Sequence, residues 1–370
     1  MYSHKYIIKY RTKKCNMSHI ALLIHGCIEN GNGDICATIN IAQILSKHFQ
    51  IPLAIYFTGS PSVLIRLTDF HSSLPILKTY QDVIDFKPTH IVSFHAHSSI
   101  DLIAKLPRIN FEEYQYIPHE PNSYGLGLNV KGFITDPIHH GLGIFQMDIA
   151  KDELCAISLP TKGPYYFCYT NHCDKYKYHR IFAATVVTNL RPHGDVGLIF
   201  PGQFSIKLFA KQKLLNWLSD QDFREIRYGN MMMPILSSGT RILTLITGQF
   251  SHNEFLYLMS ISEPEVICTG DQSVGEALMM GKKIYYQTHG HKSLFSRALA
   301  ELINDIADIE INFCYNRVTK WIGDFSYRVA LMSEHFSKLT NWDRVLKQIR
   351  QHHNCQDRIV EITRQFLQDS

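Results

Sequence analysis

A strand, a glycine turn and a helix follow one another in residues 265–287, and this order constrains the fold more than any other feature. The apolar run 265–268 is typical of a buried strand, Gly270 permits a turn, and apolar residues then recur at helical spacing until Gly281. A second strand is predicted at 284–286. A helix that begins at the carboxyl end of a parallel strand presents backbone N–H groups and a positive dipole end, which suit a phosphate or diphosphate. The alternative is an ordinary strand–helix turn with Asp271 or Ser273 as the N-cap.

The first half of the chain repeats a β–α rhythm. Apolar runs predict strands at 20–24, 53–57, 89–94, 114–117 and 132–135. Helical periodicity predicts a helix after Asp34, which is the natural N-cap, and a shorter one at 81–86. Near-continuous apolar strands that alternate with helices indicate a parallel sheet covered on both faces.

A second β–α series follows the stretch at 160–164, which we take as a linker. Strands are predicted at 165–169, 196–200, 225–228 and 242–246, and helices at 176–190, 206–218, 253–260, 325–339, 342–349 and 359–367. The predicted fold class is α/β, with two Rossmann-like domains that face each other across a cleft. Their boundaries are 17–160 and 161–340, with C-terminal helices at 341–370 that pack back across the cleft.

Composition limits the functional classes. A formal charge of +4 over 370 residues gives no argument for nucleic acid binding. Nine cysteines, an odd number without a C-x-x-C pair, indicate free thiols in a reducing compartment, and we expect a cytoplasmic protein. No apolar run approaches the roughly 18–20 residues that span a bilayer. Residues 1–16 read as a disordered leader or an over-long start.

Two loops carry a resemblance to a known superfamily. The first is Asn30-Gly31-Asn32-Gly33-Asp34, and the second is Thr269-Gly270-Asp271-Gln272-Ser273-Val274, with Gly281-Lys282-Lys283 after it. Both resemble loops of the GT-B glycosyltransferases and, more narrowly, of the arginine rhamnosyltransferases that modify elongation factor P. Asn30 and Gln272 stand where that narrower family has acids, so the donor or the acceptor can differ.

The resemblance implies an inverting, metal-independent glycosyltransferase without a cofactor. Its C-terminal domain would hold a nucleotide sugar and its N-terminal domain an acceptor, for which a protein side chain is one option. Asp34 is then the candidate general base and His25, at the end of the first strand, a second one. Asp271 is expected to accept a hydrogen bond from the sugar or acceptor, or to order its loop.

The remaining candidates line the two sides of the predicted cleft. Backbone N–H groups of Gln272 and Ser273, after Gly270, and the Ser273 hydroxyl would stabilise the departing diphosphate, and the resemblance makes Asp271, Gln272 and Ser273 its clamp. Glu276 is expected on the exposed face of its helix. Further donor-side candidates are Gln249, Gln272 and Gln287, and the acceptor-side candidates are Asn30, Asn32, His95, His119 and Glu120.

Three other functions stay open. A metal-dependent hydrolase would use the histidine-rich loops, with ligands drawn from His95, His97, His119, Asp136, His139 and His140. A nucleotide-sugar epimerase would share the architecture but need an acid/base pair at one sugar carbon. A non-catalytic GT-B-like protein would bind a nucleotide sugar without turnover.

Overall fold

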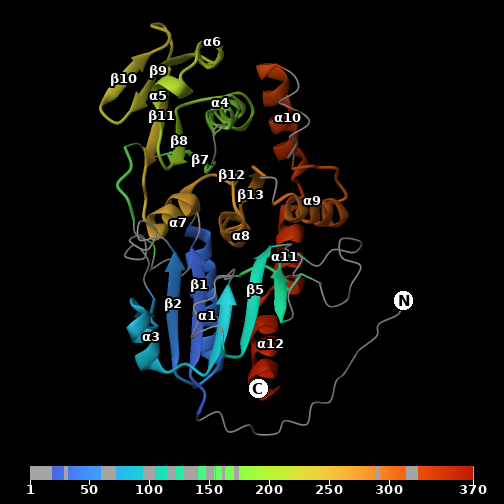
Figure 1. The fold of residues 1–370 in the computed structure, drawn as a ribbon. Coiled ribbons are helices and arrows are strands. Elements are labelled where there is room, and N and C mark those ends of the chain that lie inside the picture. The colour runs from blue at the N-terminus through green and yellow to red at the C-terminus, as the bar shows by residue number, and fades with distance from the viewer. Residues whose placement is uncertain are drawn as a thin grey trace.

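The chain forms two parallel β-sheets that lie end to end, with helices around each (Figure 1). The computed structural model describes residues 19–28, 32–59, 72–94, 105–114, 122–128, 141–146, 154, 156–160, 163–170, 175–288, 292–313 and 324–369. In Figure 1 the arrows of strands β1, β2 and β5 point toward helices α7 and α8 of the other half. The carboxyl ends of the first sheet therefore face the second half of the chain.

The N-terminal sheet is parallel throughout, in the order β3-β2-β1-β4-β5-β6. Its strands are β1 (Leu22–Ile28), β2 (Leu53–Gly59), β3 (Ile76–Leu77), β4 (His90–Phe94), β5 (Arg108–Tyr114) and β6 (Ser123–Leu126). The strand order reverses between β1 and β4, and in open α/β sheets ligands bind in the crevice at such a reversal.

Helices cover both faces of this sheet, as continuous apolar strands require. Helix α1 (Asn32–His48) packs so closely on β1 that a Cβ at Gly26 would collide with Thr38 and Phe57. Helix α3 (Tyr80–Phe86) lies on the opposite face, where its Val83 packs against Leu23.

The C-terminal sheet has the order β10-β9-β11-β8-β7-β12-β13 and is parallel except for the edge strand β10. Its strands are β7 (Tyr165–Cys168), β8 (Val196–Pro201), β9 (Phe223–Tyr228), β10 (Met231–Pro234), β11 (Arg241–Gly248), β12 (Glu265–Cys268) and β13 (Lys283–Tyr286). Here the order reverses between β7 and β12, so the crevice expected in this half lies beside the end of β12.

Eight helices or helical turns of the described chain accompany this sheet. They are α4 (Lys175–Thr185) with the π-helical turn Val186–Leu190, α5 (Ile206–Phe209), α6 (Gln212–Asp220), α7 (His252–Ile261), α8 (Asp271–Met279), α9 (Ser293–Ala307) and α10 (Phe325–Lys338). Helix α8 joins β12 to β13 and contacts α1 of the other half. The two predicted loops therefore open onto helices that touch each other.

The last two helices return from the C-terminal half to the N-terminal half. Helix α11 (Trp342–His352) packs against α9, and α12 (Gln356–Asp369) packs against α1. The Arg364 guanidinium lies 5.8 Å from the ring centre of Phe49, and Phe366 meets His90 edge-on. A turn between the two helices pairs with residues 141–146, because Ile144 donates to the His353 carbonyl and accepts from the Cys355 N–H.

Gly143 makes this pairing possible, and its replacement is our first prediction. Its φ is +116°, and a Cβ there would lie 2.7 Å from backbone atoms of His353, Asn354 and Cys355. Gly143→Ala is expected to lower the free energy of unfolding by about 2–4 kcal/mol, since strain and overlap add. Chemical denaturation measures the change.

Gly202→Ala is the matched control for Gly143→Ala. Gly202 also has a positive φ, +96°, but no residue that the structure describes lies within 4 Å of its Cβ position. This control should therefore carry the cost of backbone strain alone. Equal losses in the two variants would refute the tight contact at Gly143.

The predicted α/β class with two Rossmann-like sheets is confirmed. The helix expected at 206–218 is split into α5 and α6, and the strands β3, β6 and β10 were not expected. Of the strand predicted at 114–117 only Tyr114 is described, as the last residue of β5. The strand predicted at 132–135 lies outside the described residues, and the domain boundaries stay predictions.

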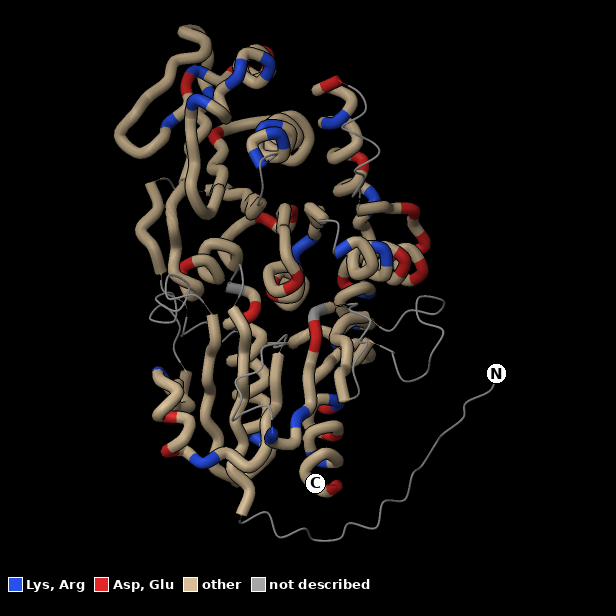
Figure 2. Tube along the Cα trace, viewed as in Figure 1, with Lys and Arg blue, Asp and Glu red and all other residues tan. Residues whose placement is uncertain are grey.

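Lys and Arg are interspersed with Asp and Glu along the described trace (Figure 2). Within the described ranges, every helix is too short or too polar to cross a bilayer.

Candidate functional site

The start of helix α8 has the geometry of an anion-binding helix terminus. Gly270 precedes the helix with φ +81°, and none of the described residues lies within 4 Å of its Cβ position, so the described part of the chain leaves space over the turn. The first backbone bond of the helix runs from the Val274 N–H to the Gly270 carbonyl, at 3.2 Å. The N–H groups before Val274 belong to the first turn, whose donors and dipole favour a negative charge. The expected strand–turn–helix arrangement is present.

Asp271, the first residue of α8, is held by two neighbours. The Tyr286 hydroxyl donates to its Oδ1 at 3.1 Å, and the Lys292 ammonium lies 2.8 Å from its Oδ2. The carboxylate thus ties α8 to β13 and to the residue before α9, which agrees with a loop-ordering role. Because Lys292 offsets its negative charge, Asp271 repels a nearby phosphate less than an isolated carboxylate would.

Glu276 is buried, which corrects the expectation that it lies on the exposed face of α8. Only 3% of the residue is exposed, and its Oε1 lies 2.9 Å from Gln272 Nε2 and 3.3 Å from His252 Nε2. Burial raises the pKa of the Glu276 carboxyl, while His252 and the hydrogen bond from Gln272 act in the opposite direction. A buried carboxylate in a crevice, with a perturbed pKa, is a candidate for ligand binding.

The other donor-side candidates fall into different positions. The Ser273 hydroxyl is buried and donates to the carbonyls of Thr269 and Gly270, so its hydrogen is used within the first turn. Gln287 is buried beside this turn, where its backbone carbonyl accepts a hydrogen bond from the Thr269 hydroxyl at 3.0 Å. Gln249 is exposed just beyond the end of β11.

Helix α1 brings Asp34 to the other side of the site. Asp34 is the third residue of α1 and not its N-cap, because the helix already begins at Asn32. Burial raises the pKa of the Cys36 thiol, and the charges of Glu276 and Asp34 raise it further. One buried thiol thus lies within electrostatic reach of both carboxylates, although they belong to different halves of the chain.

His25 was predicted at the end of the first strand, and this placement was wrong. It is the fourth residue of the seven-residue strand β1 and is fully buried. Its Nε2 lies 3.0 Å from Thr58 Oγ1, and burial, with a smaller effect of Arg108, lowers the pKa of the imidazole to about 4. His25 therefore lies inside the sheet and not at its edge, so Asp34 is the better placed base candidate.

The remaining acceptor-side and metal-site candidates are less fully described. Asn32 is the first residue of α1. Asn30, His95, His97, His119, Glu120, Asp136, His139 and His140 lie outside the described residues. Those predictions stay open.

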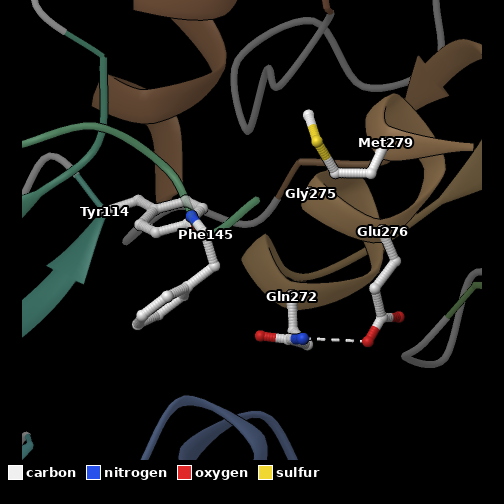
Figure 3. Close-up of a pocket in the computed structure, with 6 residues that line it drawn as sticks. All are labelled: Tyr114, Phe145, Gln272, Gly275, Glu276 and Met279. Atoms are coloured by element: carbon white, nitrogen blue, oxygen red, sulfur yellow. Dashed lines mark hydrogen bonds between the residues drawn. The ribbon is translucent and has the colours of Figure 1, made fainter. Parts of the chain in front are cut away.

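A small hollow separates α8 from the N-terminal half. Figure 3 shows Tyr114 and Phe145 on one side and Gln272, Glu276 and Met279 of α8 on the other. The hollow has no room for a water molecule, whereas typical ligand pockets have roughly 300–1,000 Å³. The Tyr114 hydroxyl accepts from the Phe145 N–H at 2.9 Å, so both aromatic residues form one wall. The halves are closed on each other here.

Lys292, Tyr286 and His252 belong to the site but were missed in the sequence. Lys292 follows a stretch without periodicity, and no spacing ties it to Asp271. Tyr286 was read as an ordinary strand residue. His252 lies one residue before the helix predicted at 253–260, and its pairing with Glu276 depends on how α7 packs beside α8.

Known proteins match this chain in structure alone. No family model and no curated protein matches the sequence. The glycosyltransferase SnogD from Streptomyces nogalater superposes with a TM-score of 0.52 at 12% identity, over 94% of this chain and 99% of its own. The glycotransferase of kitacinnamycin gives a TM-score of 0.56 at 9% identity, over 94% and 99%.

An epimerase is similar to the same degree. The UDP-GlcNAc 2-epimerase from Neisseria meningitidis, bound to UDP-GlcNAc, superposes with a TM-score of 0.52 at 13% identity, over 94% of this chain and all of its own. None of these three is a rhamnosyltransferase, so the narrower resemblance stays a prediction. The match over nearly the whole length, with two parallel sheets facing each other, gives the chain the GT-B fold.

Proposed function

We propose that the chain is a glycosyltransferase that moves a sugar from a nucleotide-sugar donor to an acceptor. The observation that carries the proposal is the start of α8 at the carboxyl end of β12, open over Gly270, with buried Glu276 one turn along. It stands beside the reversal of strand order between β7 and β12. Helix termini of this kind bind phosphates, and ligands of open α/β sheets occupy this crevice.

The donor would be held by complementary chemistry along α8. Backbone N–H groups of the first turn would bind the diphosphate, and the dipole would stabilise it as it leaves. The Glu276 carboxylate would accept hydrogen bonds from a vicinal diol such as that of a ribose. Because the hollow beside α8 has no room even for a water molecule, the two halves would have to separate for a nucleotide sugar to enter.

Transfer itself needs a base on the opposite side. The acceptor's nucleophile would attack the anomeric carbon and pass its proton to Asp34, while the bond from that carbon to the phosphate oxygen breaks. The nucleoside diphosphate would then depart with the electron pair. A carboxylate base that activates the acceptor directly suits inversion at the anomeric carbon.

An epimerase is the second candidate, since the Neisseria meningitidis epimerase matches with the same TM-score as SnogD. Such an enzyme would change one sugar carbon of the bound nucleotide sugar and would need no acceptor. NMR of a nucleotide sugar incubated with the protein alone separates the two. New sugar resonances with the nucleotide still attached indicate epimerisation. Their absence, together with transfer to an added acceptor, indicates a transferase.

The first experiment is a thermal-shift panel of UDP, GDP, dTDP and CMP sugars on the wild type and on Gly270→Val. A true donor at 100 times its dissociation constant adds about 2.7 kcal/mol of stability, which is readily visible. Valine at φ +81° would disturb the turn and fill the space over it. Stabilisation by one nucleotide class that is weakened in Gly270→Val supports the proposal.

The control for this panel is Gly229→Val, at a glycine of positive φ in the turn from β9 to β10, which also has open space around its Cβ. It should bind the donor as the wild type does. Stabilisation of neither wild type nor control by any nucleotide sugar would refute a donor site at α8.

A further inference from the structure

Three polar side chains form a row across the centre of the N-terminal sheet. His25 of β1 is in register with Ser93 of β4, and Ser93 is in register with Asn110 of β5. Residues in register on adjacent parallel strands point to the same face, about 4.8 Å apart. The three therefore lie side by side on the face opposite α1, and Ser93 is one residue from the carboxyl end of β4.

Each member of the row is buried and has one polar atom that finds no hydrogen-bond partner among the described residues. These atoms are His25 Nδ1, Ser93 Oγ and Asn110 Oδ1, and the three residues are 0%, 0% and 7% exposed. The other polar atoms of the row are engaged, since His25 Nε2 meets Thr58 and Asn110 Nδ2 donates to Ser123 at 3.3 Å.

Polar residues at these positions are costly for the fold. Two residues closer to the amino ends of β1 and β4, the same face carries the apolar pair Leu23 and Ile91, which packs under α3. Central strands of a parallel sheet are normally apolar on both faces, and a buried polar atom without a partner destabilises the fold. Such exceptions to the rules of folding concentrate where a protein binds something.

We propose that the row His25–Ser93–Asn110 is a binding site for an uncharged group that donates hydrogen bonds, such as a hydroxyl or a carboxamide. That this group belongs to the acceptor of sugar transfer rests on the function proposed above. The site lies in the half of the chain opposite the donor helix, toward the strand ends that face it.

The chemistry of the row sets the class of ligand. Asn110 Oδ1 can only accept a hydrogen bond, and the Ser93 hydroxyl can accept as well as donate. His25 is neutral at physiological pH, because its pKa is about 4. Two charged residues share this face of β5, Arg108 and the buried Glu112, and their opposite charges favour neither an anion nor a cation. A neutral donor of hydrogen bonds matches the row best.

Small probes test the site without a nucleotide sugar. The result can therefore be interpreted even if no nucleotide sugar binds in the thermal-shift panel. Acetamide and methyl glucoside are titrated against acetate and methylammonium, with binding followed by saturation-transfer NMR. The proteins are the wild type, Ser93→Ala, Asn110→Leu and Thr363→Val. Thr363 is the matched control, because its hydroxyl is also fully buried and has no partner in the described part of the chain, but it lies on α12.

The neutral probes should bind the wild type and Thr363→Val with the same affinity. Their affinity for Ser93→Ala and Asn110→Leu should be about fivefold lower or weaker still. The charged probes should bind none of them. The unfolding temperature of Ser93→Ala should be unchanged or raised, since an unmet polar atom is removed. Equal affinity of the neutral probes for all four proteins would overturn the proposal. So would a lower unfolding temperature of Ser93→Ala with no change in Thr363→Val, which would mean that the Ser93 hydroxyl is satisfied inside the fold.

Discussion

Asp34→Asn is expected to reduce sugar transfer by about 10²- to 10⁴-fold while leaving the affinity for the nucleotide sugar unchanged. The amide keeps the size of the side chain but cannot take the acceptor's proton. Asp34 belongs to α1 and the donor helix is α8, so the change should act on turnover and not on donor binding. Rates at saturating donor, together with calorimetric binding of the nucleoside diphosphate, measure the two quantities separately.

Asp85→Asn on α3 is the control for this substitution. Asp85 is an exposed aspartate at a distance from α8, and its carboxylate only accepts from Gln81 at 3.0 Å. It should transfer sugar at the wild-type rate. An Asp34→Asn protein that retains the full rate would remove Asp34 as the base and leave the transfer mechanism to another group.

Glu276→Gln is expected to weaken binding of the nucleotide about 10- to 100-fold, because hydrogen bonds to a charged acceptor are stronger than those to an amide. In the protein without ligand the same change should leave the free energy of unfolding at pH 7 unchanged or raise it by about 1 kcal/mol. A neutral amide avoids the cost of burying a charge and can still contact Gln272 and His252.

The pH dependence of this variant has a definite sign. The pKa of Glu276 is higher in the folded protein than its ordinary value of 4.5. The carboxyl therefore contributes stability that is fully present below pH 4.5 and is lost as pH rises through the folded pKa. The stability gap between Glu276→Gln and the wild type should shift in favour of the variant over that rise, as denaturation at a series of pH values would show. A gap that does not change with pH would contradict the raised pKa, and undiminished nucleotide affinity would remove Glu276 from the donor site.

The fold was readable from the sequence because its signals are local. Apolar runs such as 53–57 and 89–94, followed by helical periodicity, located β2 and β4, and Gly270 located the turn before α8. The edge strand β10 gave no such signal, since Met231–Pro234 ends in a proline and pairs antiparallel with β9 across a tight turn. The break between α5 and α6 also follows from tertiary packing, because the intervening Ala210 and Lys211 are compatible with a helix.

The site was readable only in part. Gly270, Asp271 and Ser273 could be predicted because the residues next to a turn or a helix start largely determine it. Glu276 was misplaced because α8 has its N-terminal half pressed against α1 and Tyr114, so even its polar side is covered. The burial of a side chain depends on what packs over the helix, and both α1 and Tyr114 are more than 150 residues away from Glu276 in sequence.

The packing of α12 on α1 bears on how the chain folds during synthesis. Helix α1 is among the first elements made, but the helix that covers its outer side is made only after the whole C-terminal half. Until then α12 does not cover α1, and Phe49 lacks its contact with Arg364. N-terminal units usually fold first as a chain emerges, and long-range contacts slow that process. The N-terminal half should therefore complete its folding only after α12 has been synthesised, and it should depend on chaperones until then. Its expression as an isolated fragment should give aggregates unless residues 356–369 are supplied with it.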